Sequence, residues 1–285
     1  MRKLVIHCWG GLGSQLYAWA MAEMVVKKFP RRKITLVFHS SGVTKRYSDL
    51  KFLNSMFNMK FIDDYISNPT QNQKSPTNHY SMKVLLKKFL TFSRFTLYCN
   101  TNIEFNKIKP WTLSLRGHYS HINLDLHIVS RILSRIYEEF GISLVKSMKQ
   151  DNSISVHYRL GDLQHLENKT YVNPNDLRGC IQTIIFSREC KTVAVYSDDR
   201  VAAQELLHDF LPAESNFLES DVWDALFNLI ETNYFIGTNS KISLWAAIFR
   251  KVIDNYSWVY LPKQMKAVLE DNLLNMADCK NIHYY

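Results

Sequence analysis

A histidine, an arginine and an aspartate stand close together in residues 153–162, whose sequence is SISVHYRLGD. The apolar residues of this segment are β-branched, which favours a buried strand, and Gly161 favours a turn at its end. His157, Arg159 and Asp162 therefore come at the carboxyl end of a predicted strand, where open α/β sheets bind their ligands. A plainer interpretation is that Arg159 and Asp162 form an ion pair that stabilises the turn.

Two more polar groups follow predicted strands further along the chain. Asp198 and Asp199 come after residues 192–196, and Asn239 and Ser240 come after residues 234–236. The carboxyl ends of parallel strands lie at one edge of a sheet, so we expect these side chains near the segment that ends in Arg159. Three such coincidences favour a ligand site over unrelated structural contacts.

The residue types in this set suit a nucleoside diphosphate. Arginine presents paired N–H donors that match phosphate oxygens. The hydroxyl groups of Ser240 and Ser243, together with the backbone N–H groups at the start of a helix, are further donors to a phosphate. Asp198 or Asp199 can accept hydrogen bonds from a base edge such as that of guanine. A nucleoside diphosphate ligand satisfies all of these groups.

A glycine-rich turn, GGLGSQ at residues 10–15, follows the first predicted strand. It does not fit a dinucleotide fingerprint, because the third glycine would fall at Leu16 and the next strand lacks the acidic residue expected for a ribose. It does not fit a phosphate loop either, because no Gly-Lys-Ser/Thr follows. Two interpretations stay open: a tight turn from strand to helix, or a close approach of the backbone to a ligand held between two halves of the chain.

The elements that must position these residues alternate between strand and helix. Residues 4–8 predict a strand, 15–29 a helix and 34–38 a second strand, which is a βαβ opening and favours a parallel sheet. Residues 141–152 are the best linker, so we predict domains at 1–150 and 151–285. The last predicted helix, residues 264–274, is a candidate to return to the first domain.

Composition narrows the class of protein. The chain has 285 residues, a net charge of +9 and 46% hydrophobic residues, which is typical of a globular protein with a basic surface. Its five cysteines have no metal-finger spacing, and no acidic or histidine cluster has ligand spacing, so we predict no metal and a cytoplasmic location. The sequence has no run of about 18 apolar residues, so we predict no membrane-spanning helix. Nucleic-acid-binding motifs are missing too, and a nucleic-acid role would rest on the charge alone.

Two weaker features lie in the first half of the chain. Residues 81–98 predict a basic amphipathic helix, either a surface helix of the first domain or a peripheral contact with an anionic membrane. His118 follows a predicted strand and is a weak candidate for a general base. An ordinary surface histidine is the plainer interpretation.

Several motifs in order resemble the bacterial α-1,2-fucosyltransferases of glycosyltransferase family 11. Residues 10–17 (GGLGSQLY) are similar to the family's GGLGNQ(M/L)F opening, and HYRLGD at 157–162 is similar to its HxRRxD signature. The segment YSDD at 196–199 matches the family's SDD segment, and residues 221–247 resemble its final block. Together these motifs extend over nearly the whole chain.

The resemblance implies a GT-B-like α/β enzyme with two Rossmann-type domains on parallel sheets and a cleft between them. The first domain would take the acceptor and the second the GDP-sugar, with metal-independent transfer and inversion at the anomeric carbon. Arg159 would neutralise the departing GDP, with Asp162 beside it in the catalytic motif. The remaining donor contacts would come from Gly11, Gly13, Ser14, Gln15, His157, Asp198, Asp199, Asn239, Ser240 and Ser243.

The sequence departs from the family pattern at two positions. Leu160 replaces the second arginine of HxRRxD, and Ser14 replaces the asparagine of GGLGNQ. The expected donor is GDP-fucose, and these departures raise the alternative of a 3,6-dideoxy relative such as GDP-colitose. The expected acceptor is a galactose-containing glycan, such as a lipid-linked O-antigen unit at the inner face of the plasma membrane. A second alternative is a protein that binds nucleotide or glycan without turnover.

Overall fold

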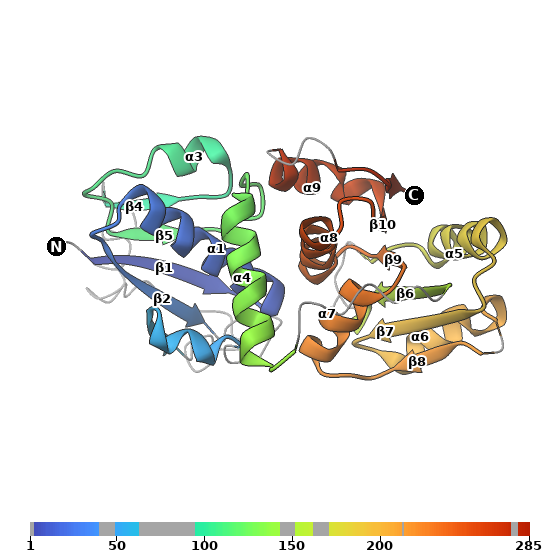
Figure 1. Cartoon of the computed structure of the whole chain (residues 1–285). Coiled ribbons are helices and arrows are strands. Elements are labelled where there is room, and N and C mark those ends of the chain that lie inside the picture. Colours follow the sequence, from blue (N-terminus) through green and yellow to red (C-terminus); the bar gives the residue numbers. More distant parts are fainter. Residues whose placement is uncertain are drawn as a thin grey trace, which may run out of the picture. The chain divides into compact units, whose positions relative to one another are not determined.

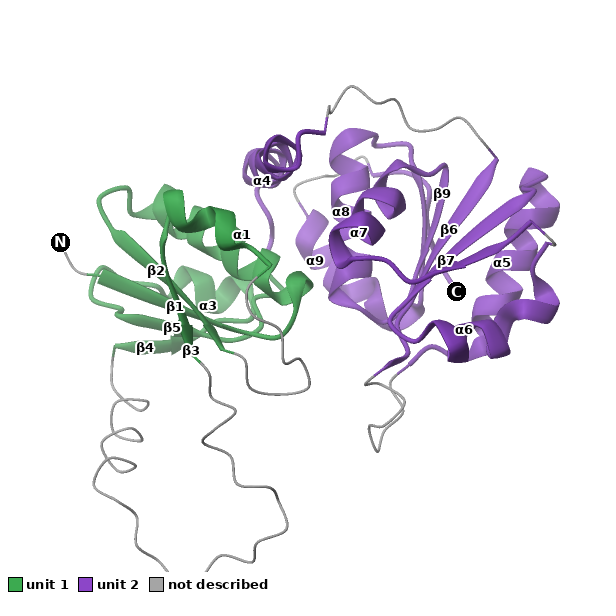
Figure 2. Cartoon of the chain, turned by 90° about the horizontal axis from the view of Figure 1, so that it is seen from below, with its two compact units in different colours: residues 1–122 green, residues 123–285 purple. Residues whose placement is uncertain are grey.

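The chain forms two compact units, residues 1–122 and residues 123–285, in a computed structural model (Figures 1 and 2). The structure describes residues 3–39, 49–62, 95–142, 152–161, 171–212, 214–274 and 279–285. No helix in these ranges is both long and apolar enough to cross a membrane. Asp162 and most of the predicted basic helix lie outside the described residues.

Unit 1 is built on a five-stranded sheet in which every pairing is parallel, with the strand order β3-β2-β1-β5-β4. The strands are β1 (Lys3–Trp9), β2 (Lys33–His39), β3 (Asn58–Ile62), β4 (Thr96–Tyr98) and β5 (Ser114–Arg116). The helices described here are α1 (Leu12–Lys28), the 3-10 helix η1 (Lys51–Ser55) and α3 (Asn102–Asn106).

The core of unit 1 lies between α1 and one face of the sheet. Leu4, Ile6 and Cys8 alternate along β1 and are buried, while the residues between them are partly exposed. The helix α1 is apolar on most of its surface and buries twelve of its seventeen residues, as expected for a helix that is enclosed rather than half-solvated. This packing fixes the glycine turn at residues 10–11 to the carboxyl end of β1.

Unit 2 is built on a six-stranded parallel sheet with helices on both faces (Figure 2). The strands are β6 (Ser153–Tyr158), β7 (Thr192–Ser197), β8 (Asn216–Leu218), β9 (Tyr234–Gly237), β10 (Trp258–Leu261) and β11 (Ile282–Tyr284). The helices are α4 (Leu126–Glu139), α5 (Pro174–Arg188), α6 (Arg200–Leu207), η4 (His208–Phe210), α7 (Val222–Glu231), α8 (Lys241–Ile253), η5 (Lys263–Met265) and α9 (Lys266–Leu273).

The strand order of unit 2 is β8-β7-β6-β9-β10-β11. The chain moves outward from β6 to β8, then returns to the other side of β6 and moves outward again from β9 to β11. The order therefore reverses between β6 and β9, which is the doubly wound order of a Rossmann fold. Sheets of this kind bind their ligands at the carboxyl ends of the strands on either side of the reversal, which here are β6 and β9.

The two faces of the β6 strand serve different purposes. Ile154, Val156 and Tyr158 are buried in a cluster with α5 and α6. His157 points to the opposite face, where its ring contacts Ser243 of α8. This alternation is the two-residue period of a strand, and it directs the apolar residues to one core and the polar ones to the ligand edge.

A buried arginine ties α8 to the end of α7. The Arg250 guanidinium donates to the carbonyl oxygens of Leu229, Ile230 and Thr232 at 2.6–3.0 Å, and also to those of Asn233 and Trp258. Burial lowers the pKa of Arg250 to about 9. The carbonyl groups at the end of a helix lack intrahelical partners, and this side chain supplies them.

The prediction of an α/β chain with two Rossmann-type domains on parallel sheets is confirmed. The cleft expected between them stays a prediction. The compact units divide at residue 122, whereas the predicted boundary was residue 150, because α4 packs against α8 of unit 2. The last helix, α9, also belongs to unit 2. Residues 96–98 form a strand, so the helix predicted over 81–98 was wrong at its end.

Candidate functional site

The carboxyl ends of β6 and β9 are joined by a buried threonine. Thr238 is fully buried, and its hydroxyl donates to the carbonyl oxygen of His157 at 2.8 Å. The same hydroxyl accepts a hydrogen bond from the backbone N–H of Arg159 at 3.0 Å. Thr238 thus fixes the backbone on both sides of Tyr158, directly at the point where the strand order reverses. The sequence reasoning missed Thr238, because a threonine after a strand carries no motif of its own.

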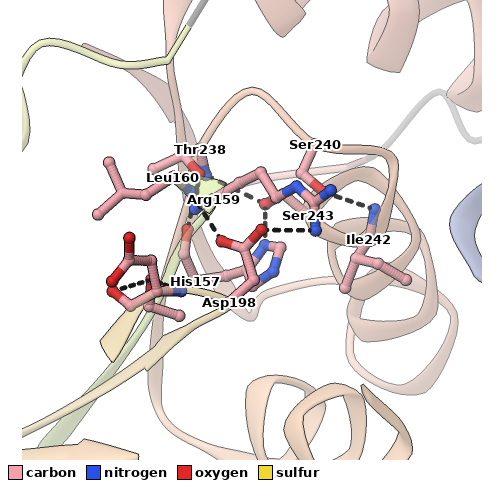
Figure 3. Close-up of polar contacts among 10 residues, drawn as sticks. His157, Arg159, Leu160, Asp198, Thr238, Ser240, Ile242 and Ser243 are labelled. Carbon is pink, nitrogen blue, oxygen red and sulfur yellow. Dashed lines mark hydrogen bonds and ion pairs between the residues drawn. The ribbon is translucent and has the colours of Figure 1, made fainter. Parts of the chain in front are cut away.

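The partner of Arg159 is Asp198, at the end of the neighbouring strand (Figure 3). Its Oδ2 lies 2.8 Å from Arg159 NH1, and its Oδ1 accepts from the Leu160 N–H at 2.9 Å. The side chain of Arg159 is 32% exposed and that of Asp198 is 24% exposed. The Asp198 carboxylate therefore orients the guanidinium, and about a third of the Arg159 side chain is exposed to solvent.

Gly161 is needed because the Asp198 carboxylate lies against it. A β-carbon at position 161 would be 2.2 Å from Asp198 Oδ2 and 2.8 Å from its Cγ. Real atoms do not approach so closely, so any side chain there would displace the carboxylate. From the sequence, we expected Gly161 to form a turn. The structure shows a second reason for a glycine at this position, which is the close packing between the ends of two strands.

The His157 ring is oriented by α8. Its Nδ1 lies 2.8 Å from the Ser243 hydroxyl, and that hydroxyl also accepts from the Thr238 N–H at 3.0 Å. Burial and the charge of Arg159 lower the pKa of His157 to about 3. A neutral ring donates one hydrogen bond and accepts one, which suits recognition of a polar ligand rather than attraction of an anion.

The N-terminus of α8 adds a second source of positive potential. Ser240 is the N-cap, and its hydroxyl accepts from the Ile242 N–H at 3.2 Å. The first N–H groups of a helix and its dipole favour an anion, and α8 begins directly after β9. Figure 3 shows Ser240 and Ser243 on the same side of the sheet edge as Arg159. Three of the residues singled out in the sequence therefore converge there.

The other predicted donor residues of unit 2 have local roles. Asp199 is the N-cap of α6, where its Oδ1 accepts from the Ala202 N–H at 3.0 Å. Asn239 connects β9 to the α8 cap. A contact between guanine and Asp198 or Asp199 stays a prediction. Arg159 pairs with Asp198. The ion pair considered for Arg159 and Asp162 stays a prediction, because Asp162 lies outside the described residues.

In unit 1 the glycine turn is held from within. Gly10 has φ +107°, a conformation that favours glycine, and Gly11 is the N-cap of α1. Gln15 is buried: its Nε2 donates to the Gly10 carbonyl at 3.3 Å, and its Oε1 accepts from the Asp49 N–H at 2.9 Å. Gln15 therefore positions the turn. Gly13 is buried and Ser14 half-buried in the first turn of α1, and their contacts to a donor stay predictions.

A second polar cluster at the carboxyl end of β1 was not found from the sequence. His7 Nδ1 lies 2.9 Å from His39 Nε2, and the rings of Trp9 and His39 stack with centroids 4.3 Å apart. These contacts follow from the pairing of β1 with β2, which sets Trp9 opposite His39. His118, the weak candidate for a general base, is exposed, and its backbone N–H donates to Asn100 Oδ1 at 2.7 Å.

Protein-family models and curated proteins yield no match to this chain. Among solved structures, the chain is similar to POFUT1 in complex with GDP-fucose at 13% identity and a TM-score of 0.45, over 88% of this chain and 94% of that chain. It is similar to a family 9 glycosyl transferase from Veillonella parvula at 10% identity and a TM-score of 0.45, over 91% and 80%. It is also similar to the E. coli heptosyltransferase WaaC with ADP at 9% identity and a TM-score of 0.47, over 99% and 92%. The case for a function therefore rests on the residues of the site.

Proposed function

We propose that the chain is a glycosyltransferase whose unit 2 binds a GDP-sugar at the carboxyl ends of β6 and β9. The observation that carries the proposal is the convergence of the Arg159 guanidinium and the α8 N-terminus at the point where the strand order reverses. Ligands of doubly wound sheets bind at this point, and both groups favour the negative charge of a diphosphate.

The same arrangement supplies what sugar transfer needs. In the reaction, an acceptor hydroxyl oxygen forms a bond to the anomeric carbon as the bond from that carbon to the β-phosphate oxygen breaks. Negative charge grows on the departing GDP, so a guanidinium held close by stabilises the transition state more than the ground state. Asp198 holds Arg159 in place before the donor arrives. We propose inversion at the anomeric carbon and no metal, with the charge of Arg159 and the partial positive charge of the α8 N-terminus stabilising the departing GDP.

His157 has a positioning role in this scheme. Its ring is neutral and is fixed by Ser243, so it can donate to or accept from the ribose or base without adding charge. We propose that His157 and Ser243 place the nucleoside, with Asp198 and Asp199 nearest the base. Asp162 follows Arg159 in the motif and is proposed to act with it. The acceptor proton leaves to solvent or to a base in unit 1, for which His118 is the candidate.

The proposed donor is GDP-fucose, transferred to a galactose hydroxyl in an α-1,2 linkage. Leu160 is fully buried in the cluster packed against α5, so its side chain does not lie at the sugar-binding edge. The case for GDP-colitose therefore loses one of its two supports, and the substitution at Ser14 is what remains. We place the enzyme in the cytoplasm, where a lipid-linked acceptor would bring it to the inner face of the plasma membrane.

Release of GDP tests this proposal. The full chain is incubated with GDP-fucose, GDP-colitose or GDP-mannose, each with and without a galactose-terminated glycan. We expect acceptor-dependent release of GDP that is fastest with GDP-fucose. Faster release from GDP-colitose would favour the alternative donor. Binding of GDP without release from any of the three would identify a non-catalytic nucleotide-binding protein.

A further inference from the structure

An open pocket lies at the amino edge of the unit 1 sheet, away from the glycine turn. It is lined by the end of α1, the turn into β2 and the segment before β5, and its volume is about 590 Å³. Four of its seven lining residues are apolar: Phe29, Pro30, Pro110 and Trp111. Parallel strands begin at this edge and end at the other, so the pocket is separate from the residues that follow β1.

The other three residues that line the pocket are cationic. Lys28, Arg31 and Arg32 line the pocket, and no carboxylate is among the described residues that line it. Five of the seven residues from 27 to 33 are lysine or arginine. The lining of the pocket therefore combines apolar side chains with a strong positive charge.

The backbone holds two of these cations in place. Lys28 Nζ donates to the carbonyl oxygens of Phe105 and Asn106 at 3.2 and 3.3 Å, which are the last carbonyls of α3. Arg32 NH1 donates to the Lys109 carbonyl at 3.0 Å. Burial and the neighbouring Lys109 lower the pKa of Lys28. Positive charges are thus fixed near one another although they repel, which an anion at the pocket would offset.

Arg32 and Trp111 differ in their exposure at this pocket. Its Nε and NH2 atoms are buried and have no hydrogen-bond partner among the described residues. These atoms have no exposed surface, so Arg32 contributes its positive charge to the pocket rather than a direct contact. Trp111, in contrast, is 50% exposed beside it. A large apolar ring in water next to a cluster of cations is typical of a surface that contacts the membrane interface.

We propose that this pocket, with Trp111 and the cations of residues 27–33, docks on an anionic phospholipid bilayer. The indole and the proline rings enter the headgroup region, while the exposed Arg31 and Lys28 contact lipid phosphates. Tryptophan is enriched at this depth because its ring is apolar and its N–H is polar. The surface differs from residues 81–98, and the docking does not depend on the proposed sugar transfer.

Co-sedimentation of the full chain with vesicles tests the docking. The vesicles are phosphatidylcholine alone, or phosphatidylcholine with about 30% of the anionic lipid phosphatidylglycerol. They contain neither acceptor nor GDP-sugar, so the result is independent of catalysis. We expect the wild type to sediment with the anionic vesicles and not with the neutral ones. Absence of binding to the anionic vesicles would overturn the proposal.

Matched variants localise the contact. The test variant is Trp111→Ser with Arg31→Glu. The control is Phe186→Ser with Lys191→Glu, which removes an 84%-exposed aromatic ring and reverses one charge in unit 2. Reversing the charge at position 31 removes an attractive contact with the lipid and adds a repulsive one. From this charge change alone, we expect the partition coefficient of the test variant into anionic vesicles to fall roughly 25-fold. The control should stay within about twofold of the wild type. Equal loss in both variants would show that only the net charge matters.

A second measurement separates a bilayer from a soluble phosphate. Brominated phosphatidylglycerol should quench part of the tryptophan fluorescence of the wild type, and Trp111→Phe should lose that part while still binding. Inorganic phosphate, compared with chloride at the same ionic strength, should not raise the melting temperature. A phosphate-specific rise that is lost in Arg31→Glu, without vesicle binding, would assign the pocket to a soluble phosphate ligand instead.

Discussion

Replacing Gly161 with alanine tests the arrangement of the site through stability alone. The added β-carbon would lie 2.2 Å from Asp198 Oδ2, so the carboxylate must move. Asp198 would then lose its ion pair with Arg159 and its hydrogen bond from the Leu160 N–H. The backbone alone would not accommodate the change, because the clash is with a carboxylate held at both oxygens.

The magnitude follows from the two lost interactions. Leu160 is fully buried, and leaving its N–H without a partner costs about 1–3 kcal/mol. The Arg159–Asp198 pair is partly exposed, so its loss adds only about 0.2–1 kcal/mol. Alanine also lowers the conformational entropy of the unfolded chain, which raises the free energy of unfolding by about 0.4–1 kcal/mol. The net expectation is a loss of about 1–3 kcal/mol in the free energy of unfolding.

Urea unfolding of the full chain measures this change, with Gly179→Ala as the matched control. Gly179 lies in α5, and a β-carbon there would meet no atom within 4 Å. Alanine is favoured over glycine in a helix by about 1 kcal/mol, so the control should be stabilised. In an Asp198→Ala background the Gly161→Ala change should cost much less, because the clash is gone. Stabilisation of both glycine variants alike would refute the reasoning.

Three further predictions concern groups that support the site. Thr238→Val should lower the free energy of unfolding by about 1–3 kcal/mol, because the Arg159 N–H and the His157 carbonyl lose their hydrogen-bond partner. Thr238→Ser should keep most of the wild-type stability. Urea titration measures both variants. Since the pKa of His157 is lowered to about 3, the unfolded chain binds the extra proton, so stability should be full above pH 6.5 and fall below it by at most about 1.4 kcal/mol per pH unit. His157→Gln should reduce that slope, and an unchanged pH profile would contradict a neutral buried ring. Arg250→Met should cost about 3–5 kcal/mol, and Arg250→Lys should not rescue it, because five carbonyl oxygens lose a forked donor; thermal unfolding checks this.

The strands at the centre of each sheet were predictable, and those at the edges were not. The runs that form β1, β2, β6, β7, β9 and β10 are largely apolar, because each of these strands buries at least one face. The missed strands are β3, β4, β8 and β11, which are the four edges. They are short and partly exposed, so their sequences carry no continuous apolar pattern.

The candidate site was predictable where residues follow central strands. His157, Arg159, Asp198, Ser240 and Ser243 were identified because parallel strands bring their carboxyl ends together. The partner of Arg159 was not identified, because the alignment of β6 with β7 decides that Asp198 reaches it. The contact between His7 and His39 depends in the same way on the pairing of β1 with β2. Pairing between strands distant in sequence leaves no local pattern.

The period of the strand corrects one inference drawn from a motif. Leu160 departs from the family pattern, which has an arginine at this position, and that departure raised the alternative donor. In β6 and the residue pair after it, positions alternate between faces, and Leu160 joins Tyr158 in the core packed against α5. Arg159 lies on the other side, next to Asp198. A residue that departs from a motif therefore has to be located on one side of the strand before its effect on substrate binding is inferred.

The most direct test of the account is calorimetric titration of GDP into the wild type, Arg159→Ala and Lys191→Ala. Lys191 precedes β7 and lies at the amino edge of the same sheet, so it is a control for charge. A hydrogen bond from a charged donor contributes about 1.5–3 kcal/mol, so the Kd for GDP should rise roughly 10- to 100-fold in Arg159→Ala and stay unchanged in Lys191→Ala. Equal affinity of the wild type and Arg159→Ala, or no binding of GDP by the wild type, would contradict a diphosphate site at the ends of β6 and β9.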